Sequence, residues 1–546
     1  MSQNQNQNQN QNQTQNAKSV RFQLAILALG VATVAVALDG TSLAAAIPTI
    51  SESISGSQVE TFWAGVSYLL ASTSCIFLWT SLSNALGRQI TVIIVLMILV
   101  AGSIVCATAT SYSIMIAGRT IQGVSGGGVL GLTMAVITDL VPLLKRARYL
   151  ALISSIFAIG SIGGPVIGGA CAVSGQWRWI YWLNLPIAGL SLIGVALYLK
   201  LDRREASLVT KLRETDWPGL VLFAISVTAL LVPLTWGGIQ FPWGSWHTIL
   251  PIALSLAGIV GFILYEKYLT KRPFLPLYIF RNYSTSIIYI GSFINGVLLY
   301  AQVYYMPEYF QAVKLYSPLI AGVAALPGSL TAIPCAVFTG VMVDKTGHYR
   351  WAVWTGWALA TFGFGIMCLL GVNTSVPAWI FIRIAAGLGT GMLLPALNIA
   401  LQASVPQTDV VMATTMFQFL RDFGHTVGVS IGSSILDNVV RTQLHRPDVV
   451  SVVPANLTDL TAVTLISEIK KMSPDSVEAL ALRGALARAF EAIWATMCGL
   501  SGFGLLIHLV LKAYDMDQEI ATDQGWAQQD LASNTRITPT QIQVEK

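Results

Sequence analysis

Apolar blocks separated by short polar stretches follow one another along nearly the whole chain. A helix of about twenty residues spans the ~30 Å hydrocarbon core of a bilayer. Every backbone polar group inside lipid needs an internal partner, and no long alternating strand pattern is present, so the blocks predict helices. We expect an all-α polytopic membrane protein with 14 transmembrane helices, at 24–48, 61–82, 90–110, 113–138, 149–173, 179–200, 217–236, 247–266, 285–306, 317–343, 351–371, 376–402, 411–437 and 488–512.

Composition supports the same fold class and excludes several functions. Of the 546 residues, 54% are hydrophobic and 10% charged, whereas soluble proteins carry about 25% charged residues. An ordinary cytosolic enzyme or a nucleic-acid-binding protein is therefore not expected. The sequence has no G-x-x-x-x-G-K-[ST] loop for ATP, and its six cysteines lie within or at the ends of apolar blocks. We expect no enzymatic activity, cofactor, metal site or disulfide framework.

The basic residues predict how the chain is threaded through the bilayer. Placing both termini in the cytoplasm puts twenty Lys and Arg residues on that side and eight on the other. Basic residues near span ends favour the cytoplasm, so both termini are predicted to be cytoplasmic. Of the Asn-x-Ser/Thr sites, Asn373 and Asn456 then face outward and are candidate glycosylation sites, with Asn456 in the longer loop.

An internal repeat divides the chain into two similar halves. The pattern Arg-x-x-x-Gly-x-x-x-Gly at 119–127 recurs at 383–391, and three glycines at 160–168 recur at 424–432, both at an offset of 264 residues. A further match, from 84–87 to 344–347, has an offset of 260. Two six-helix units with two inserted helices are therefore predicted, and parallel repeats of this kind form many secondary transporters.

This organisation predicts the following segments. They are a disordered Gln/Asn-rich cytoplasmic tail at 1–22, an N-terminal six-helix half at 23–200, a cytoplasmic linker with two inserted helices at 201–268, a C-terminal six-helix half at 284–513 with an outer loop at 439–486, and a cytoplasmic tail at 514–546.

Charged residues inside the apolar blocks are candidate functional residues, because an intramembrane charge needs a partner or a wet cavity. Arg119 is one, unless it extends to the interface from a helix end. Asp39 is either a proton carrier or a structural acceptor for neighbouring backbone amides. Four more form a second set of candidate cavity charges, and His425 among them is either a proton relay or a structural residue: Arg383, Arg421, Asp422 and His425.

One block contains a string of small residues that would weaken a helix in water. The string is Gly160, Gly164, Pro165, Gly168 and Gly169. Small residues four apart let helix backbones approach closely, and proline adds a bend. A bent, close-packed contact of this kind suits a protein whose halves rock, although static membrane proteins also use it.

Four motifs stand out along the chain: Leu-Asp-x-Thr at 38–41, Arg-x-x-Gln-Gly at 119–123, the glycine string at 160–169 and an aromatic segment at 177–186. Together they resemble the Major Facilitator Superfamily, in particular its fungal fourteen-helix drug:proton antiporter branch, over about 24–512. The resemblance implies alternating access driven by the proton gradient. It also implies that Arg119 belongs to the proton-coupling machinery and that Gly164 and Pro165 belong to an antiporter hinge.

The resemblance further implies an inner gate in the loop after the second helix and in its repeat. The residues that fit are Gly87, Arg88, Asp344, Lys345 and Gly347. The first copy departs from the family pattern, because Thr80, Asn84 and Ala85 stand where the family has Gly, Asp and Arg. The inner gate of the N-terminal half is therefore expected to close with fewer ion pairs.

We expect a proton-coupled efflux transporter that exports a secondary metabolite, toxin or xenobiotic, most simply as a monomer in the plasma membrane. Its partners are then a small organic molecule, protons and the lipid bilayer. The alternative on the same fold is a vacuolar or plasma-membrane transporter of a siderophore or a basic amino acid. A non-transporting membrane sensor is a rival from a different class, although no large signalling tail is present.

The predicted threading can be tested with glycans. Changing Asn456 to Gln should remove a glycan that electrophoresis with and without an endoglycosidase detects. The corresponding change at Asn282, which is predicted to face the cytoplasm, should alter nothing. A glycan on Asn282 would overturn the threading.

Overall fold

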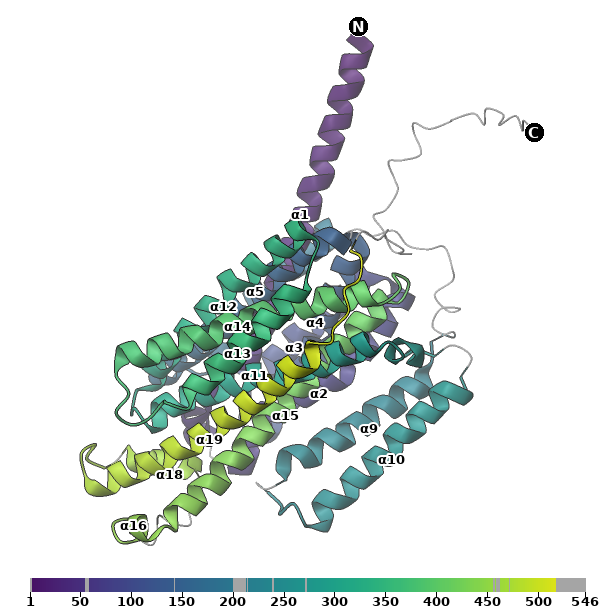
Figure 1. Ribbon diagram of the computed structural model, residues 1–546. Coiled ribbons are helices and arrows are strands. Elements are labelled where there is room, and N and C mark those ends of the chain that lie inside the picture. Colours follow the sequence, from purple (N-terminus) through teal and green to yellow (C-terminus); the bar gives the residue numbers. More distant parts are fainter. Residues whose placement is uncertain are drawn as a thin grey trace.

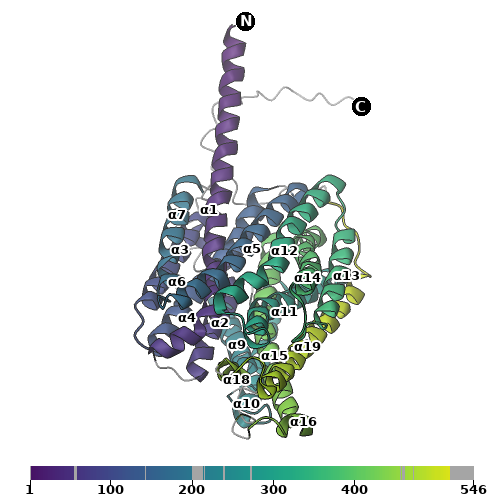
Figure 2. The same ribbon diagram turned by 90° about the vertical axis from the view of Figure 1, so that its left-hand side faces the viewer.

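The computed structural model is an all-helical bundle built from two similar halves (Figures 1 and 2). It describes residues 2–54, 58–141, 143–199, 213, 215–237, 240–270, 273–454, 457, 462–470 and 472–516. The N-terminal half consists of α1 (Ser2–Ile54), α2 (Gln58–Leu86), α3 (Arg88–Ala107), α4 (Tyr112–Leu140), α5 (Leu143–Val173), α6 (Trp179–Trp182) and α7 (Asn184–Tyr198).

The rest of the bundle follows in the predicted order. Two inserted helices are α9 (Trp217–Trp236) and α10 (Trp246–Tyr268). After a short 3-10 turn, η1 (Leu277–Phe280), the C-terminal half consists of α11 (Tyr283–Ala312), α12 (Pro318–Thr346), α13 (Arg350–Met367), α14 (Val376–Ser404), α15 (Val410–Leu444), α16 (Pro447–Val450), α18 (Ala462–Ile469) and α19 (Val477–His508).

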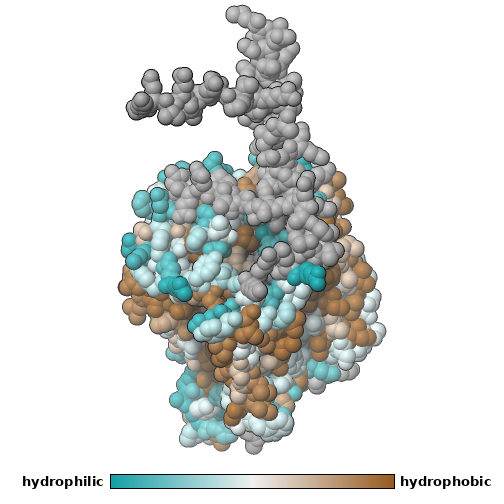
Figure 3. Space-filling view, turned by 90° about the vertical axis from the view of Figure 1, so that its right-hand side faces the viewer, coloured by the Kyte–Doolittle hydropathy of each residue, from teal (hydrophilic) through white to brown (hydrophobic). Residues whose placement is uncertain are grey.

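Twelve helices within the described part of the chain are long and apolar enough to cross a membrane. The α6 and α7 segments count as one of these spans. The two other predicted spans, α13 and α15, are helices of 18 and 35 residues in the same bundle. Arg350 and three tryptophans lower the mean hydropathy of α13, and Arg421, Asp422 and His425 lower that of α15, so these two helices are not among the twelve. Figure 3 shows many apolar side chains, in brown, on the side of the bundle that it presents.

Several helix pairs join the halves. Helix α5 lies along α12 and also contacts α14, and α15 contacts both α2 and α4. At one end, Arg146 of α5 donates hydrogen bonds of 3.1 Å to both Gln402 and Gln407. We call this the inner end, because the charge pattern predicts that it faces the cytoplasm. At the opposite, outer end, Gly169 of α5 packs on the backbone of α12 at Leu319. The halves therefore touch at both ends of the bundle.

Helices α9 and α10 form a hairpin beside this junction. Helix α9 packs against α2 and α15, one helix from each half, whereas α10 packs mainly on α9 (Figure 1). The Phe223 ring of α9 packs edge-to-face with Phe77 of α2 at a centroid distance of 5.1 Å and is tilted against Phe419 of α15 at 5.0 Å. The inserted hairpin thus covers one side of the contact between the halves.

Glycines set how closely the helices approach, and they do so in the same way in both halves. Gly127 of α4 packs on the carbonyl of Ser72 in α2, and Gly391 of α14 packs on the carbonyl of Ala332 in α12. The loops after α2 and α12 both use glycine at positive φ, 91° at Gly87 and 66° at Gly347. The sequence repeat is therefore a structural repeat.

Three predicted boundaries are corrected. Helix α1 starts at Ser2, within the 1–22 segment predicted to be disordered, because extending an existing helix avoids the cost of nucleation and glutamine is a good helix former. The predicted span at 179–200 is interrupted at Leu183, where Pro186 has no N–H to bond the Trp182 carbonyl. Much of the predicted outer loop at 439–486 is helical, because α15 runs to Leu444 and α19 begins at Val477. Most of the linker at 201–216 and of the tail at 514–546 lies outside the described residues.

We predict that helix packing at Gly168 limits stability. A Cβ there would overlap the Ser42 carbonyl of α1, whereas nothing lies within 4 Å of a Cβ at Gly189 in α7. Gly168→Leu should therefore cost about 1–3 kcal/mol through overpacking and lower the melting temperature of the detergent-solubilised protein. Gly189→Leu is the matched control and should melt like the unchanged protein. Equal melting of the two variants would contradict this packing.

Candidate functional site

A buried ion pair links α1 and α4. Arg119 Nη1 lies 2.9 Å from Asp39 Oδ2, and both side chains are fully buried. The two residues singled out separately in the sequence are therefore partners. A lone charge in a low-dielectric environment is strongly unfavourable. Each residue therefore lowers the free-energy cost of burying the charge of the other inside the bilayer. The alternative that Arg119 extends to the interface from a helix end is excluded.

The carboxylate of Asp39 is held by two further donors. Asn184 Nδ2 of α7 lies 2.7 Å from Oδ1, and Gln122 Nε2 of α4 lies 2.9 Å from the same atom. Arg119 in turn donates to Gln122 Oε1 and to the backbone carbonyl of Ala64. Asp39 thus accepts hydrogen bonds from three side chains on two other helices. A change in its charge would alter the contacts among α1, α4 and α7 together.

An aromatic ring covers the other side of the arginine. The Tyr68 ring of α2 lies 4.5 Å from Arg119 Cζ, a distance typical of a cation–π contact. Sequence reasoning missed Tyr68 and the role of Asn184. Asn184 lies in the aromatic segment at 177–186 that the sequence singled out. The spacing of residues in that segment does not predict that the Asn184 amide contacts α1.

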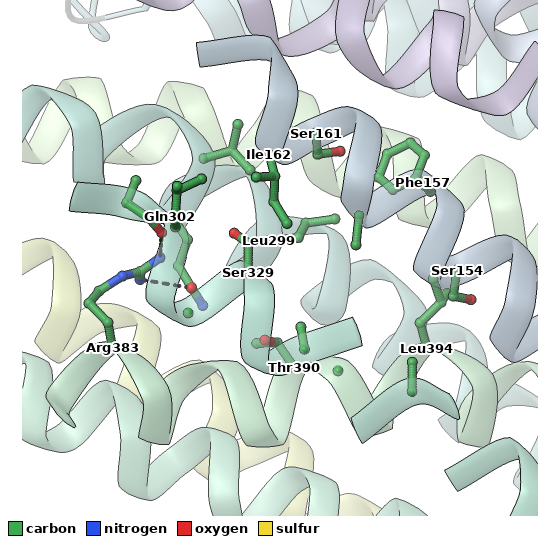
Figure 4. Close-up of a pocket in the computed structure, with 18 of the residues that line it drawn as sticks. Ser154, Phe157, Ser161, Ile162, Leu299, Gln302, Ser329, Arg383, Thr390 and Leu394 are labelled. Carbon is green, nitrogen blue, oxygen red and sulfur yellow. Dashed lines mark hydrogen bonds between the residues drawn. The ribbon is translucent and has the colours of Figure 1, made fainter. Parts of the chain in front are cut away.

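A cavity lies between the halves. It encloses about 940 Å³, including space open to solvent, and its walls come from α5, α11, α12 and α14, with one residue of α15. Apolar residues such as Phe157, Ile162, Leu299 and Leu394 alternate with hydroxyl and amide groups (Figure 4). This mixture of apolar wall and few polar groups is typical of a site for a small organic molecule.

Two of the predicted cavity charges line this cavity. Arg383 of α14 donates to Gln302 Oε1 at 3.0 Å and points to it at one end of the cavity (Figure 4). Arg421 of α15 lies over the Phe157 ring, with Cζ 5.3 Å from the centroid. Both arginines are nearly fully buried, with exposed fractions of 2% and 3%.

The other two, Asp422 and His425, are not among the residues that line the cavity. Asp422 accepts from Gln418 at 2.8 Å and from Ser72 of the N-terminal half at 3.3 Å. His425 Nδ1 lies 3.4 Å from Asp422, and its ring stacks on Tyr300 at 3.9 Å. Asp422 and its partners therefore form a polar contact between the halves.

The predicted inner-gate residues fall at the inner ends of the helices. Arg88 pairs with Asp139 of α4 at 3.0 Å and also donates to Asn84 and Ser83. The asparagine that replaces the family aspartate thus still accepts from Arg88. Asp344 and Lys345 occupy the last turn of α12, which Gly347 terminates.

One direct contact between the halves at this end comes from Arg146, which sequence reasoning used only for threading. Its guanidinium also donates to the carbonyls of Val141 and Thr138 at the end of α4. The sequence around Arg146 does not predict its partners in α14 and the following turn, because they lie more than 250 residues away in the chain.

The predicted hinge glycines form two contact surfaces on α5. Gly160, Gly164 and Gly168 face α1, at Val34 and Ala37, at Thr41 and at Ser42. Gly169 faces α12, and Pro165 lines the cavity beside Gly322. Helix α5 therefore links the helix that carries Asp39 to the opposite half.

Of the two predicted glycosylation sites, Asn373 is exposed in the turn between α13 and α14. Asn456 lies outside the described residues.

The comparisons with known proteins agree with this architecture. The family model described as Major Facilitator Superfamily matches residues 29–438. The chain belongs to the Major Facilitator Superfamily. It is 40% identical to MFS transporter L2 of Phoma sp. over 93% of this chain and 84% of that protein. It is 34% identical to efflux pump FUS6 of Gibberella moniliformis over 93% and 91%, respectively. A third relative, 33% identical over 93% and 92%, is the acurin A biosynthesis cluster MFS-type transporter of Aspergillus aculeatus.

Solved structures of the Major Facilitator Superfamily share the fold. The human organic anion transporter MFSD10 (TETRAN) has a TM-score of 0.54 and 16% identity, over 90% of this chain and 98% of that one. The proton:xylose symporter XylE has a TM-score of 0.55 and 11% identity, over 91% and 97%. The protein is thus a multi-pass membrane transporter for a small molecule and not an enzyme.

We predict that the Asp39–Arg119 pair is needed as a pair. Asp39→Ala should leave Arg119 buried without a counter-charge and cost about 3–5 kcal/mol, seen as a lower melting temperature in detergent. Adding Arg119→Met should restore part of this loss, because it removes the unpaired charge. Asp475→Ala, at an exposed position, is the matched control. A double variant less stable than Asp39→Ala would contradict this account.

Proposed function

We propose that this transporter exports a small organic molecule across a fungal membrane in exchange for protons, by alternating access. The observation that carries the proposal is the buried Asp39–Arg119 pair, which lies on the helices adjoining the cavity wall without lining the cavity itself. Efflux as the direction is supported by fungal relatives named as efflux pumps.

Asp39 is the group that takes up the proton in this proposal. Protonation removes the negative charge that neutralises Arg119, and the hydrogen bonds from Asn184 and Gln122 lose their charged acceptor. The contacts that hold α1, α4 and α7 together then weaken. Because α1 packs on α5 through glycines and α5 forms the contact with α12, the change reaches the junction between the halves.

The contacts at the two ends of the bundle are the elements that would open and close. Arg146 with Gln402 and Gln407 would separate when the inner end opens, and Gly169 with Leu319 when the outer end opens. A difference of a few kcal/mol between the two states in their affinity for the proton or the cargo is enough to shift their populations.

The cargo is proposed to be an amphipathic secondary metabolite, toxin or xenobiotic, exported through the plasma membrane. The size and mixed lining of the cavity support an organic molecule over a small inorganic ion. One relative is named for a biosynthetic cluster, which supports a metabolite made by the producing organism. Both termini are proposed to face the cytoplasm.

We predict that export requires Arg119. Metabolites inside and outside the source organism would be compared by mass spectrometry, with the gene intact, deleted, and restored as Arg119→Ala. The cargo should accumulate inside in the deleted and Arg119→Ala strains only. Full export by an Arg119→Ala protein present at normal abundance would remove this residue from the mechanism.

The proton step has its own measurement with the cargo so identified. In proteoliposomes, transport by the unchanged protein should follow an imposed pH gradient, and transport by Asp39→Asn should not respond to it. Asp475→Asn is the matched control. A pH-gradient response that survives in Asp39→Asn would place proton uptake at another group.

A further inference from the structure

Equivalent arginines in the two halves have different partners. Arg119 and Arg383 occupy the same place in the repeat, and the packing of their helices fixes the correspondence. Gly123 of α4 packs on the carbonyl of Tyr68, and Gly387 of α14 packs on the carbonyl of Gly328. Tyr68 of α2 and Gly328 of α12 are therefore equivalent positions beside the two arginines.

In the N-terminal half the arginine is neutralised and covered. Asp39 supplies the counter-charge at 2.9 Å, and the Tyr68 ring covers the guanidinium. In the C-terminal half the partner of Arg383 Nη1 is Gln302, which is neutral, at 3.0 Å. Gly328 has no ring to cover Arg383, and both Gly328 and Arg383 line the cavity.

Arg383 therefore carries a buried charge without a counter-charge. Within the described part of the chain, no carboxylate oxygen lies within 4.0 Å of its guanidinium. Its Nε, and the Nε2 of Gln302 beside it, are buried without a hydrogen-bond partner. An isolated buried charge is costly, so this end of the cavity favours a ligand that supplies negative charge.

Arg421 adds a second positive charge to the same lining. Its guanidinium faces the Phe157 ring, and among the described residues it makes no ion pair within 4.0 Å and donates no hydrogen bond. The neighbouring Asp422 is engaged with Gln418, Ser72 and His425 instead. The cavity thus has two arginines and no acidic residue in its lining.

We propose that the cavity selects an amphipathic organic anion. Its acidic group binds Arg383 and the free amide of Gln302, and its apolar part lies against Phe157, Ile162 and Leu299. The proposal rests on the transport function proposed above and names the charge class of the cargo. It also argues against a basic amino acid as cargo, because such a molecule would bring a further positive charge into the cavity.

The test is a binding measurement on the purified full-length protein in nanodiscs. The probe is tritiated naphthylacetate, displaced by unlabelled naphthylacetate, naphthylacetamide or naphthylethylamine. The three share a ring system and differ in charge. The acid should bind about tenfold or more tightly than the amide and the amine, because a charged acceptor strengthens the bonds from arginine. Equal or tighter binding of the amine would overturn the proposal.

Three variants locate the effect. Arg383→Gln should remove most of the preference for the acid. Gln302→Glu should also reduce it about tenfold or more, because the new carboxylate would neutralise Arg383 as Asp39 neutralises Arg119. Gln302→Glu adds a paired charge, so it keeps the test informative if Arg383→Gln does not fold. Arg488→Gln, at an exposed position on α19, is the matched control and should keep the preference.

The outcomes separate this proposal from the transport function. A preference for the acid that persists in both Arg383→Gln and Gln302→Glu would show that the probe binds elsewhere, and the proposal would fail. Binding requires no proton gradient, so a preference lost in these variants stands even if export in exchange for protons is disproved. A cationic cargo exported in an Arg119-dependent manner would refute the charge class alone.

Discussion

The constraint on which this structure depends is that a charge inside the bilayer needs a counter-charge. In the N-terminal half the constraint is met by Asp39 and Arg119, and the pair holds α1, α4 and, through Asn184, α7 in one arrangement. Because α1 also packs on α5 along a row of glycines, this pair governs the helix that forms the contact with the other half. In the proposed mechanism, proton uptake at this carboxylate would thereby be connected to the junction where the cavity lies.

The rigid parts of the molecule come from close backbone contacts rather than from charges. Gly127 on Ser72 and Gly391 on Ala332 let α2 approach α4, and α12 approach α14, closely in both halves. Each half therefore contains direct backbone contacts between its helices. The contacts between the halves are of both kinds. Gly169 of α5 packs on the backbone of α12 at Leu319, whereas Arg146 with two glutamines, and Asp422 with Ser72, form hydrogen bonds that can break and reform.

Much of the fold follows from the sequence, because apolar block length and glycine spacing are local properties. The blocks predicted every long helix, and the repeat predicted the two halves. The predicted helix boundaries were wrong where local hydropathy does not determine the helix end. One example is Val477, where α19 begins well before its apolar block. For the site, Asp39, Arg119 and Arg383 could be found singly as charges in apolar blocks. Their partners could not, because Asn184, Tyr68 and Gln302 are ordinary residues whose meaning depends on which helices meet.

The sequence repeat does not reveal how the two halves differ around their equivalent arginines. A repeat that places arginine at both 119 and 383 suggests two equivalent sites, yet Asp39 and Tyr68 enclose one arginine while Gln302 and Gly328 leave the other open to the cavity. The first arginine has its counter-charge built into the chain, and a proton can switch that counter-charge off. The second lacks one, and an anionic ligand can supply it. A single electrostatic requirement, met internally in one half and by cargo in the other, would thus assign proton binding and cargo binding to different halves.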